Sequence, residues 1–251
     1  MIELESLTKR YADITAVRDL SLSVAKGEIF GFIGPNGAGK TTTIKMLGGI
    51  LAPTSGRVRI CGIDMAERPE DAKRKIGFIP DRPYLYEKLT AMEFLRFTAE
   101  LYRVGGNGFE RRAQQELLRF SLQDWSNDLI ESYSHGMKQR LVMAAALLIE
   151  PQVIVVDEPM VGLDPIAIKM VKDLLRKLAR EGTTVFMSTH TLQVAQDLCH
   201  RIGVIHRGTL VATGTPEELK RQAKTSETDL EAVFIRLTEE GRMGIGGSRN
   251  G

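Results

Sequence analysis

The nine residues GPNGAGKTT, from Gly34 to Thr42, constrain the fold of this chain more than any other stretch. They match the pattern G-x-x-x-x-G-K-[ST] of a phosphate-binding loop. The apolar run before them, Ile29 to Ile33, predicts a buried strand, and the residues after them predict a helix. This order of strand, loop and helix is the context that the motif requires. The alternative, a glycine turn beside a solvated lysine, is disfavoured by that context.

Each residue type in this loop suits a phosphate site. The glycines allow backbone N–H groups to turn inward toward the phosphates. Lys40 would reach the β and γ oxygens as a mobile positive charge, and Thr41 would offer its hydroxyl to Mg²⁺. We therefore expect nucleotide contacts along the whole loop, from Gly34, Pro35, Asn36, Gly37, Ala38, Gly39, Lys40, Thr41 and Thr42.

Further short apolar segments predict buried strands that alternate with helices. The helix-like stretches include Ile166 to Arg180 and Leu192 to Cys199. Near-continuous apolar strands linked by helices indicate a parallel sheet that is covered on both faces. The segments expected to form strands, besides Ile29 to Ile33, are Ile76 to Ile79, Val153 to Val156, Thr184 to Ser188 and Ile202 to Ile205.

The strand pattern stops in the middle of the chain and changes character at its ends. Approximately Glu87 to Ile149 is helix-like, broken by VGGNG, which predicts a helical subdomain inserted in the α/β core. IELESL and LSLSV near the start predict an N-terminal antiparallel β subdomain. We expect one P-loop NTPase domain over residues 1–240, with late helices at 217–222 and 230–237. The Gly-rich residues 241–251 predict a flexible tail.

Composition excludes several classes of protein. The chain has 251 residues, of which 43% are hydrophobic and 26% charged, which is ordinary for a soluble protein with a real core. Its net charge of +2 favours no nucleic-acid partner. Cys61 and Cys199 are far apart in sequence, so we expect ordinary thiols in a reducing compartment.

Two observations argue against export or membrane insertion of this chain. The N-terminal residues MIELESLTKR carry acids where a signal peptide needs an apolar stretch. The longest apolar run, Leu141 to Ile149, lies between Arg140 and Glu150 and is far shorter than the roughly 20 residues of a spanning helix. We expect the chain not to cross a membrane by itself, although it could lie against one.

Two carboxylates follow the predicted strand VIVV. Ligands of open α/β sheets bind at the carboxyl ends of strands, which would place Asp157 and Glu158 near the nucleotide. Asp157 suits the holding of Mg²⁺, and Glu158 suits the orientation or deprotonation of the attacking water. A solvated acidic pair is the alternative, and the phosphate loop makes it the weaker one.

Two further residues have a functional and a bland interpretation. His190 ends another predicted strand, where it could contact the γ-phosphate and hold Glu158 and the water in line, or could be a polar strand terminus. Tyr11 is a candidate for stacking on adenine, but a half-buried aromatic in a β-hairpin is an equally simple interpretation.

A second candidate phosphate site lies in ESYSHGMKQR, from Glu131 to Arg140. Ser134 is a suitable N-cap for the apolar helix that follows, and Gly136 lies in its first turn. A serine and a glycine at a helix N-terminus can bind phosphate. This site has no lysine of the kind that the first one has, which raises the question of which nucleotide it would serve.

In this order, the residues resemble the nucleotide-binding subunit of ABC transporters, over roughly Met1 to Leu237. In that family's terms Tyr11 matches the adenine-stacking aromatic, Gly34 to Thr42 match Walker A, and Ser134 and Gly136 match the signature motif. Val153 to Glu158 match Walker B, Gly162 to Pro165 match the D-loop, and His190 matches the switch histidine.

The resemblance implies an ATPase that uses ATP and Mg²⁺ and works as a pair of cassettes. In the family two cassettes pack head to tail, so Ser134 and Gly136 would serve the partner's ATP. It also implies an integral membrane permease as a separate chain, and a cytoplasmic location, peripheral on the inner face of the cell membrane. The pattern YSxGMKQR and the segment Asp229 to Glu240 resemble an exporter-type subgroup. Homodimer and heterodimer both stay open, as does the transported substrate.

Two positions depart from the family's pattern. The usual signature LSGGQ is Tyr133-Ser134-His135-Gly136-Met137 here, which keeps the serine and one glycine. The Q-loop glutamine should follow IGFIP, but Asp81 stands there. A carboxylate at this place could bind Mg²⁺ together with Thr41 and Asp157, while adding negative charge near the γ-phosphate. A turn aspartate after Pro80 is the alternative interpretation.

Two other classes compete with the transporter subunit. A cytosolic ABC ATPase acting as a ribosome- or DNA-associated switch would share the motifs, but it usually has two cassettes in one chain or long coiled-coil insertions. An unrelated P-loop kinase or GTPase would lack the Ser134–Gly136 motif and His190.

Overall fold

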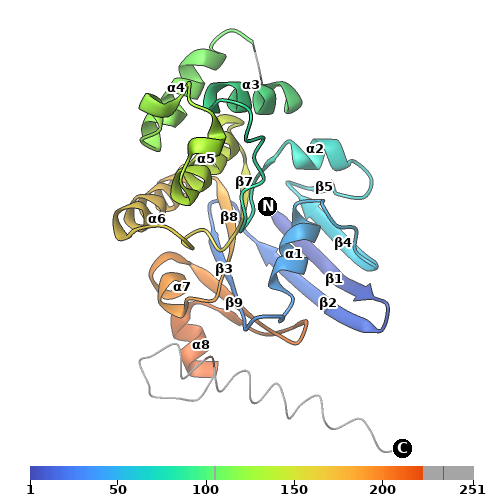
Figure 1. Cartoon of the computed structure of the whole chain (residues 1–251). Helices are drawn as coiled ribbons and strands as arrows, with labels where there is room; N and C mark the ends of the chain where they lie inside the picture. Colours follow the sequence, from blue (N-terminus) through green and yellow to red (C-terminus); the bar gives the residue numbers. More distant parts are fainter. Residues whose placement is uncertain (105, 223–233, 235–251) are drawn as a thin grey trace, which may run out of the picture.

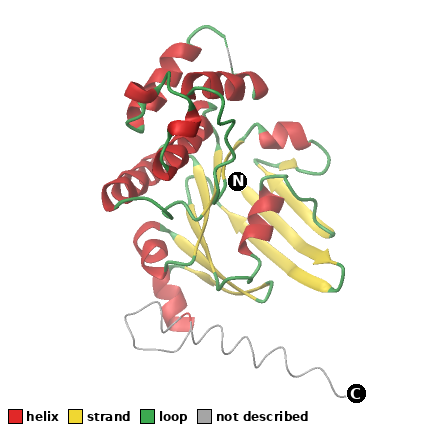
Figure 2. Cartoon of the chain, in the orientation of Figure 1, coloured by secondary structure: helices red, strands yellow, loops and turns green. Residues whose placement is uncertain are grey.

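The computed structural model describes residues 1–104, 106–222 and 234 of the chain. Two sheets lie side by side below a lobe of helices, as Figures 1 and 2 show. The larger sheet has six strands, in the order β10 (Thr209–Gly214), β9 (Arg201–His206), β3 (Ile29–Ile33), β8 (Thr184–Thr189), β7 (Val153–Asp157) and β6 (Ile76–Ile79). The smaller has four, in the order β2 (Ile14–Val24), β1 (Ile2–Tyr11), β4 (Ser55–Ile60) and β5 (Ile63–Asp64).

Helices cover the sheets and form the separate lobe. Those beside the sheets are α1 (Lys40–Leu47), α2 (Pro69–Lys73), α6 (Pro165–Arg180), α7 (Leu192–Leu198) and α8 (Pro216–Gln222). The lobe contains α3 (Ala91–Leu101), α4 (Phe109–Arg119), α5 (His135–Leu148) and the 3₁₀ turns Gln123–Trp125 and Ile130–Ser132. Within the described residues, no helix is both long and apolar enough to span a membrane.

The strands of the larger sheet form because both of their faces are buried. All five residues of β3 are buried, and its side chains alternate between two cores. Phe30 and Phe32 pack with α1 and the smaller sheet, whereas Ile29 and Ile33 pack with the helices on the other face. β3 pairs in parallel with β8 and β9, and β7 pairs in parallel with β6 and β8. This agrees with the continuous apolar runs that predicted these strands.

The smaller sheet is antiparallel and lies across α1 from the larger one. β1 pairs with β2 and β4, and the buried side chains along β2 alternate with exposed ones. The face of this sheet that contributes Ile2, Leu4 and Val58 closes over Ile44 and Leu47 of α1. Helix α1 therefore lies between the two sheets and is packed on both sides.

The inserted lobe is helical, as predicted between Ile79 and Val153. Helix α3 begins with a capping box, in which the Thr90 and Glu93 side chains each accept a hydrogen bond from the other's backbone N–H. Helix α5 begins after Ser134, whose Oγ accepts a hydrogen bond from the backbone N–H of Met137 at 3.3 Å. Ser134 is thus the N-cap that the sequence predicts.

The predicted fold class is confirmed, and three strands were missing from the prediction. All five predicted strands of the larger sheet and the antiparallel pairing of the early segments are present. β4 and β5 were missed because Arg57 and Arg59 interrupt the apolar pattern of β4, and β5 has only two residues. β10 was missed because most of its side chains are only partly buried. The predicted helix 230–237 lies outside the described residues except for Phe234, and the predicted tail 241–251 lies outside them.

One buried side chain of α5 predicts a stabilising substitution. Gln139 is 1% exposed, and neither of its amide atoms has a hydrogen-bond partner within the described part of the chain. A buried polar group without a partner destabilises the folded state. Gln139→Met keeps the shape and removes the amide, so it should raise the free energy of unfolding by about 1 kcal/mol, measured by urea denaturation. The exposed Gln115→Met is the control, and a loss of stability at position 139 would contradict the prediction.

Candidate nucleotide-binding site

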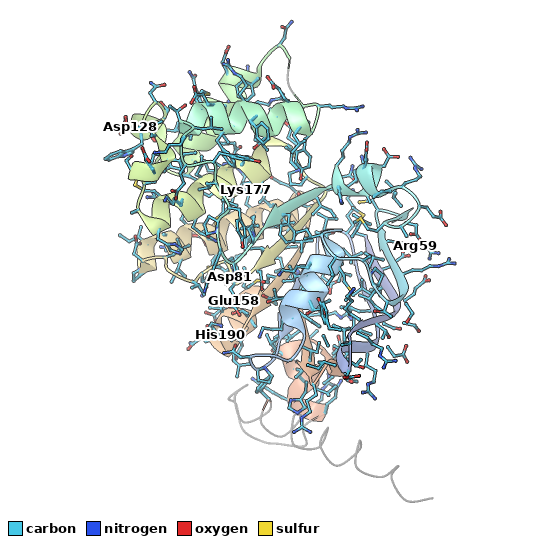
Figure 3. The ribbon with its side chains drawn as sticks, turned by 45° about the vertical axis from the view of Figure 1, so that its right-hand side comes forward. Arg59, Asp81, Asp128, Glu158, Lys177 and His190 are labelled. Atoms are coloured by element: carbon cyan, nitrogen blue, oxygen red, sulfur yellow. The ribbon has the colours of Figure 1, made fainter. Side chains whose placement is uncertain are left out.

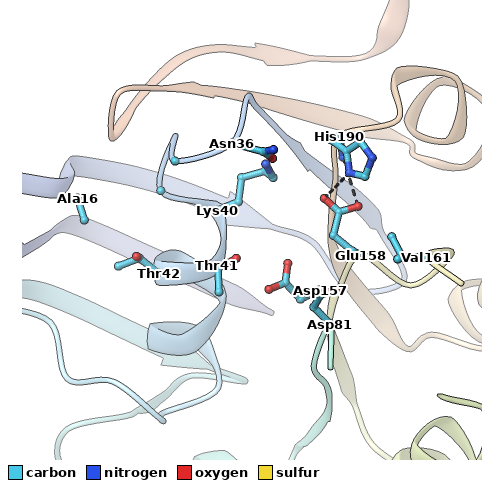
Figure 4. Close-up of a pocket in the computed structure, with 12 residues that line it drawn as sticks. Ala16, Asn36, Lys40, Thr41, Thr42, Asp81, Asp157, Glu158, Val161 and His190 are labelled. Atoms are coloured by element: carbon cyan, nitrogen blue, oxygen red, sulfur yellow. Dashed lines mark hydrogen bonds and ion pairs between the residues drawn. The ribbon is translucent and has the colours of Figure 1, made fainter. Parts of the chain in front are cut away.

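A cavity of about 400 Å³ opens where four parallel strands end. The phosphate loop follows β3, Asp81 follows β6, Glu158 follows β7, and His190 follows β8. Because these strands are parallel neighbours, their carboxyl ends meet at one edge of the sheet, as Figure 4 shows. The cavity is lined by Ala16, Asn36, Gly37, Gly39, Lys40, Thr41, Thr42, Asp81, Asp157, Glu158, Val161 and His190.

The phosphate loop is shaped by glycine at a close approach of two backbones. Gly39 precedes α1 with a φ of 111°, and a Cβ there would lie 2.6 Å from the carbonyl oxygen of Ala16. No other residue fits this conformation and this space. The loop can therefore lie against β2 while its N–H groups precede the first turn of α1, where the helix dipole favours an anion.

Lys40 is the first residue of α1, and its side chain is hydrogen-bonded to the phosphate loop. Its Nζ donates hydrogen bonds to the carbonyl oxygens of Gly34 at 2.7 Å and Pro35 at 3.2 Å. The residue is 7% exposed. Burial lowers the pKa of the Lys40 ammonium, and the nearby Glu158 and Asp157 carboxylates offset part of this change. A buried ammonium beside a loop of backbone N–H groups is suited to bind a polyphosphate, and the two nearby carboxylates keep the ammonium charged.

Asp157 is the most deeply buried acid of the site, at 4% exposed. Burial raises the pKa of its carboxyl, as do the charges of Glu158 and Asp81, whereas hydrogen bonds from Ser188 and Thr41 lower it. Ser188 Oγ donates a hydrogen bond to Asp157 Oδ1. The hydroxyl of Thr41 and the carboxylates of Asp157 and Asp81 line one side of the cavity.

This oxygen-rich donor set fits Mg²⁺, which prefers hard oxygen ligands and is commonly shared with substrate phosphates. Among the described residues, no three acidic, histidine or cysteine side chains are placed to hold a metal by themselves. Thr41 and Asp157 would thus hold the ion together with phosphate oxygens, and Asp81 would add a further carboxylate.

Glu158 and His190 form a pair on the other side of the cavity. His190 Nδ1 lies 2.9 Å from Glu158 Oε1, and the backbone N–H of His190 donates to Glu158 Oε2 at 3.4 Å. Glu158 has a φ of 50°, an uncommon conformation for a residue other than glycine. Both oxygens of the carboxylate are thereby oriented by one residue, as a base that positions a water requires. In Figure 3 the pair lies close to Asp81 on one side of the molecule.

The cavity does not bring together all the predicted nucleotide contacts. Tyr11 lies at the end of β1, paired with Ile14, and is 46% exposed; Lys9 Nζ lies 5.3 Å from its ring centroid. Neither Tyr11 nor the pair Ser134 and Gly136 lines the cavity. The contacts of Tyr11 with adenine and of Ser134 with phosphate stay predictions.

Two lining residues were missed by sequence reasoning. Ala16 lies on β2, in the other sheet, and no pattern of the sequence connects it with the phosphate loop. Val161 lies three residues after Glu158 and just before the GLDP segment, so its position beside that motif was a usable signal.

A match to a known family identifies the class of protein in which this site occurs. The profile described as ABC transporter matches residues 17–161. The chain belongs to the ABC transporter family. Within it the chain is an ATP-binding subunit, an ATPase cassette, which confirms the resemblance seen in the motifs and excludes the unrelated kinase and GTPase classes.

Individual relatives cover most of the chain. The probable multidrug ABC transporter ATP-binding protein YbhF of Escherichia coli is 35% identical over 243 residues, 96% of this chain but 42% of its own length. This chain therefore spans less than half of that relative. The daunorubicin resistance ATP-binding protein DrrA3 of Streptomyces coeruleorubidus is 37% identical, over 97% of this chain and 75% of its own. The ATP-binding protein EcsA of Bacillus subtilis is 34% identical, over 96% and 97%.

Solved cassettes have the same fold. An ATP-binding subunit of an ABC transporter, 34% identical, superposes with a TM-score of 0.90 over 95% of this chain and 99% of its own. The cassette MJ0796, in a dimeric post-hydrolysis state bound to ADP and Pi, is 30% identical with a TM-score of 0.79, over 86% and 98%.

Removal of the carboxylate of Glu158 should separate binding from turnover. A neutral amide cannot accept a proton, so Glu158→Gln should lower ATP turnover by about 10²–10⁴-fold while ATP still binds. Phosphate release and the fluorescence of a labelled ATP analogue measure the two. Glu181→Gln, an exposed carboxylate at the end of α6, is the matched control. Turnover near that of the wild type would remove Glu158 from this role.

Neutralising Asp81 should change the metal dependence. Its charge acts on Asp157 on the same side of the cavity, so Asp81→Asn should shift the half-saturating Mg²⁺ concentration upward severalfold and alter turnover without unfolding the protein. A Mg²⁺ titration of ATPase activity checks this, with Asp128→Asn on the helical lobe as the control. An unchanged titration would place Asp81 away from the metal.

Proposed function

We propose that this chain powers transport, in the direction of export, through a separate membrane permease, as one of two cassettes that share their nucleotides. The observation that supports sharing is the position of the signature motif. Ser134 and Gly136 stand at the N-terminus of α5, outside the cavity that holds Lys40 and Glu158. A motif that is suited to phosphate but does not line the chain's own cavity suits the nucleotide of a second cassette.

The residues of one site act in sequence on ATP. The backbone of Asn36 to Thr41 and the Lys40 ammonium hold the β and γ phosphates, and Lys40 exchanges its two loop carbonyls for phosphate oxygens. Thr41 and Asp157 would hold Mg²⁺, which would neutralise charge that develops on the phosphates. Glu158 orients a water for attack at the γ phosphorus and accepts its proton, while His190 fixes the carboxylate through Nδ1. The bond from the γ phosphorus to the bridging oxygen breaks, leaving ADP and phosphate.

The Ser134 hydroxyl can donate a hydrogen bond in addition to the one that it accepts. In this structure its Oγ accepts from Met137 N–H, and its proton is available for donation. In the proposed dimer it donates to the γ-phosphate of the partner's ATP. This contact would order the two cassettes around ATP and would be lost after hydrolysis.

An apolar surface beside Asp81 supports a permease as the second partner. Tyr84 is 86% exposed, and the exposed Tyr86 stacks edge-on against Phe97 with their centroids 5.3 Å apart. Leu101 is exposed on the same helix as Phe97. The adjoining groove, about 160 Å³, is lined by Phe78, Pro80, Tyr84, Phe94, Thr98, Tyr102, Val142, Ala145, Ala146 and Ile149. Such patches mark protein contact sites, and this one lies between the lobe and the segment that carries Asp81.

The names of relatives support the export direction and the location. YbhF is described as a probable multidrug ABC transporter component, and DrrA3 as a daunorubicin resistance protein. We therefore propose a cytoplasmic subunit, bound to the inner face of the cell membrane through its permease. The second candidate, a cytosolic switch on ribosomes or DNA, is disfavoured by the net charge of +2.

Co-purification tests the permease. The tagged chain should retain a polytopic membrane protein after solubilisation in mild detergent, and Tyr84→Asp with Tyr86→Asp should lose it while ATP binding persists. Arg68→Asp, at the exposed N-cap position before α2, is the control. Retention of ribosomes in place of a membrane protein would favour the cytosolic switch.

Shared nucleotides predict complementation between two inactive variants. Lys40→Ala loses the phosphate grip but keeps a signature, and Ser134→Arg keeps the grip but blocks the signature. Each alone should be nearly inactive. Mixed, they form one intact site per heterodimer, so ATPase activity should return to roughly a quarter of the wild-type value at equal mixing and should rise with protein concentration. No gain, with heterodimers shown to form, would contradict a shared site, whether the natural pair is a homodimer or a heterodimer.

A further inference from the structure

His135 stands between the two phosphate-facing residues of the signature motif, but its side chain contacts another part of the same chain. It is the first residue of α5, and its imidazole lies against Gly162. A Cβ at Gly162 would lie 2.7 Å from His135 Cδ2 and 3.0 Å from Nε2, and apart from Gly162 and its two chain neighbours no other described residue has an atom within 4 Å. Gly162 has a φ of 76°, so glycine satisfies both the backbone and the contact.

Gly162 belongs to a short segment that begins at the catalytic carboxylate. The N–H of Val161 donates to the carbonyl oxygen of Glu158 at 3.2 Å, and the N–H of Leu163 donates to that of Met160 at 3.4 Å. Val161 lines the nucleotide cavity. These backbone hydrogen bonds join Gly162, four residues further along the chain, to the backbone of Glu158.

The face of α5 that carries His135 also has unsatisfied hydrogen-bonding capacity. Gln139 lies one turn further along the same face, because residues four apart are neighbours on a helix. Its buried amide has no partner among the described residues. Met143, one turn further again, lines a small apolar space together with Pro159. This row of α5 therefore faces the segment after Glu158, in a packing that leaves one polar group unpaired.

We propose that His135 is a positioning residue for Glu158 of its own chain. The imidazole supports Gly162 from the side of α5 and so fixes the segment that orients the carboxylate. The inference rests on the proposed shared nucleotide: one motif then acts on two ATP molecules, through Ser134 and Gly136 on the partner's and through His135 and Glu158 on its own.

Kinetics of a single variant give the first test. His135→Ala should lower kcat about ten- to hundredfold, since small misplacements of a catalytic group have such effects. The KM for ATP and the affinity for a fluorescent ATP analogue should stay within twofold, because the phosphate contacts are intact. His135→Gln, which restores a planar group of similar reach, should recover part of kcat. Lys138→Ala is the matched control, because Lys138 lies in the same turn but pairs with the exposed Glu87. An unchanged kcat, or a loss in KM alone, would overturn the proposal.

A dimer with one working carboxylate tests which chain His135 serves. Two differently tagged chains, one of them Glu158→Gln, are co-purified through both tags, so that hydrolysis occurs only at the site with Glu158. His135→Ala placed in the chain that keeps Glu158 should lower this activity as strongly as in the homodimer. The same change in the Glu158→Gln chain, whose signature serves the working site, should leave it within twofold.

The reverse pattern would show that His135 acts on the partner's nucleotide as part of the signature, and would overturn the inference. The inference rests on a dimer that is active with one intact site, so a mixed dimer that binds ATP but hydrolyses none would overturn it together with the proposed function. The proposed function also fails on a different result, the absence of complementation between Lys40→Ala and Ser134→Arg.

Discussion

Parallel backbone pairing among β3, β8, β7 and β6 is the constraint on which the site depends. Four strands that run in one direction end at one edge, so residues distant in sequence meet without any long-range recognition between their side chains. Lys40, Asp81, Glu158 and His190 each follow a different strand end. The precision of their placement therefore comes from the register of the sheet, which is fixed by side chains buried on both faces.

The same edge gathers charges that would be costly elsewhere. Lys40 and Asp157 are both almost entirely buried. The loss of water lowers the pKa of Lys40 and raises the pKa of Asp157, which favours the neutral form of each. Loop carbonyls, Ser188 and Thr41 compensate in part. A buried cation and a buried anion that line one cavity suit a ligand that carries negative charge and brings a cation with it, which is what ATP with a divalent ion supplies. The same buried charges thus favour binding of the nucleotide and hold the site in its binding arrangement.

Local patterns predicted the larger sheet and the phosphate loop. They did not predict contacts that depend on how separate parts of the fold pack together. Ile29 to Ile33 and Val153 to Val156 are continuous apolar runs, and the loop between Gly34 and Thr42 has a fixed chemistry, so sequence alone located them. β4 was missed because Arg57 and Arg59 break the continuous apolar run by which the other strands were located. Ala16 was missed because its neighbour Gly39 is brought to it only by the packing of two sheets. The contact of His135 with Gly162 likewise depends on how the lobe sits on the core, which no local pattern encodes.

Helix α1 lies between the two sheets and packs against both, and it begins at the phosphate loop. A ligand bound at its first turn is thus attached to the one element that both sheets share. The two sheets and α1 form a unit, and local unfolding of this unit would release the nucleotide. The helical lobe packs on the other face of the larger sheet, mainly through α5. Amide hydrogens in β1 and β3 should accordingly gain protection together when nucleotide binds. The phosphate loop thus links the opening of one sheet to the opening of the other.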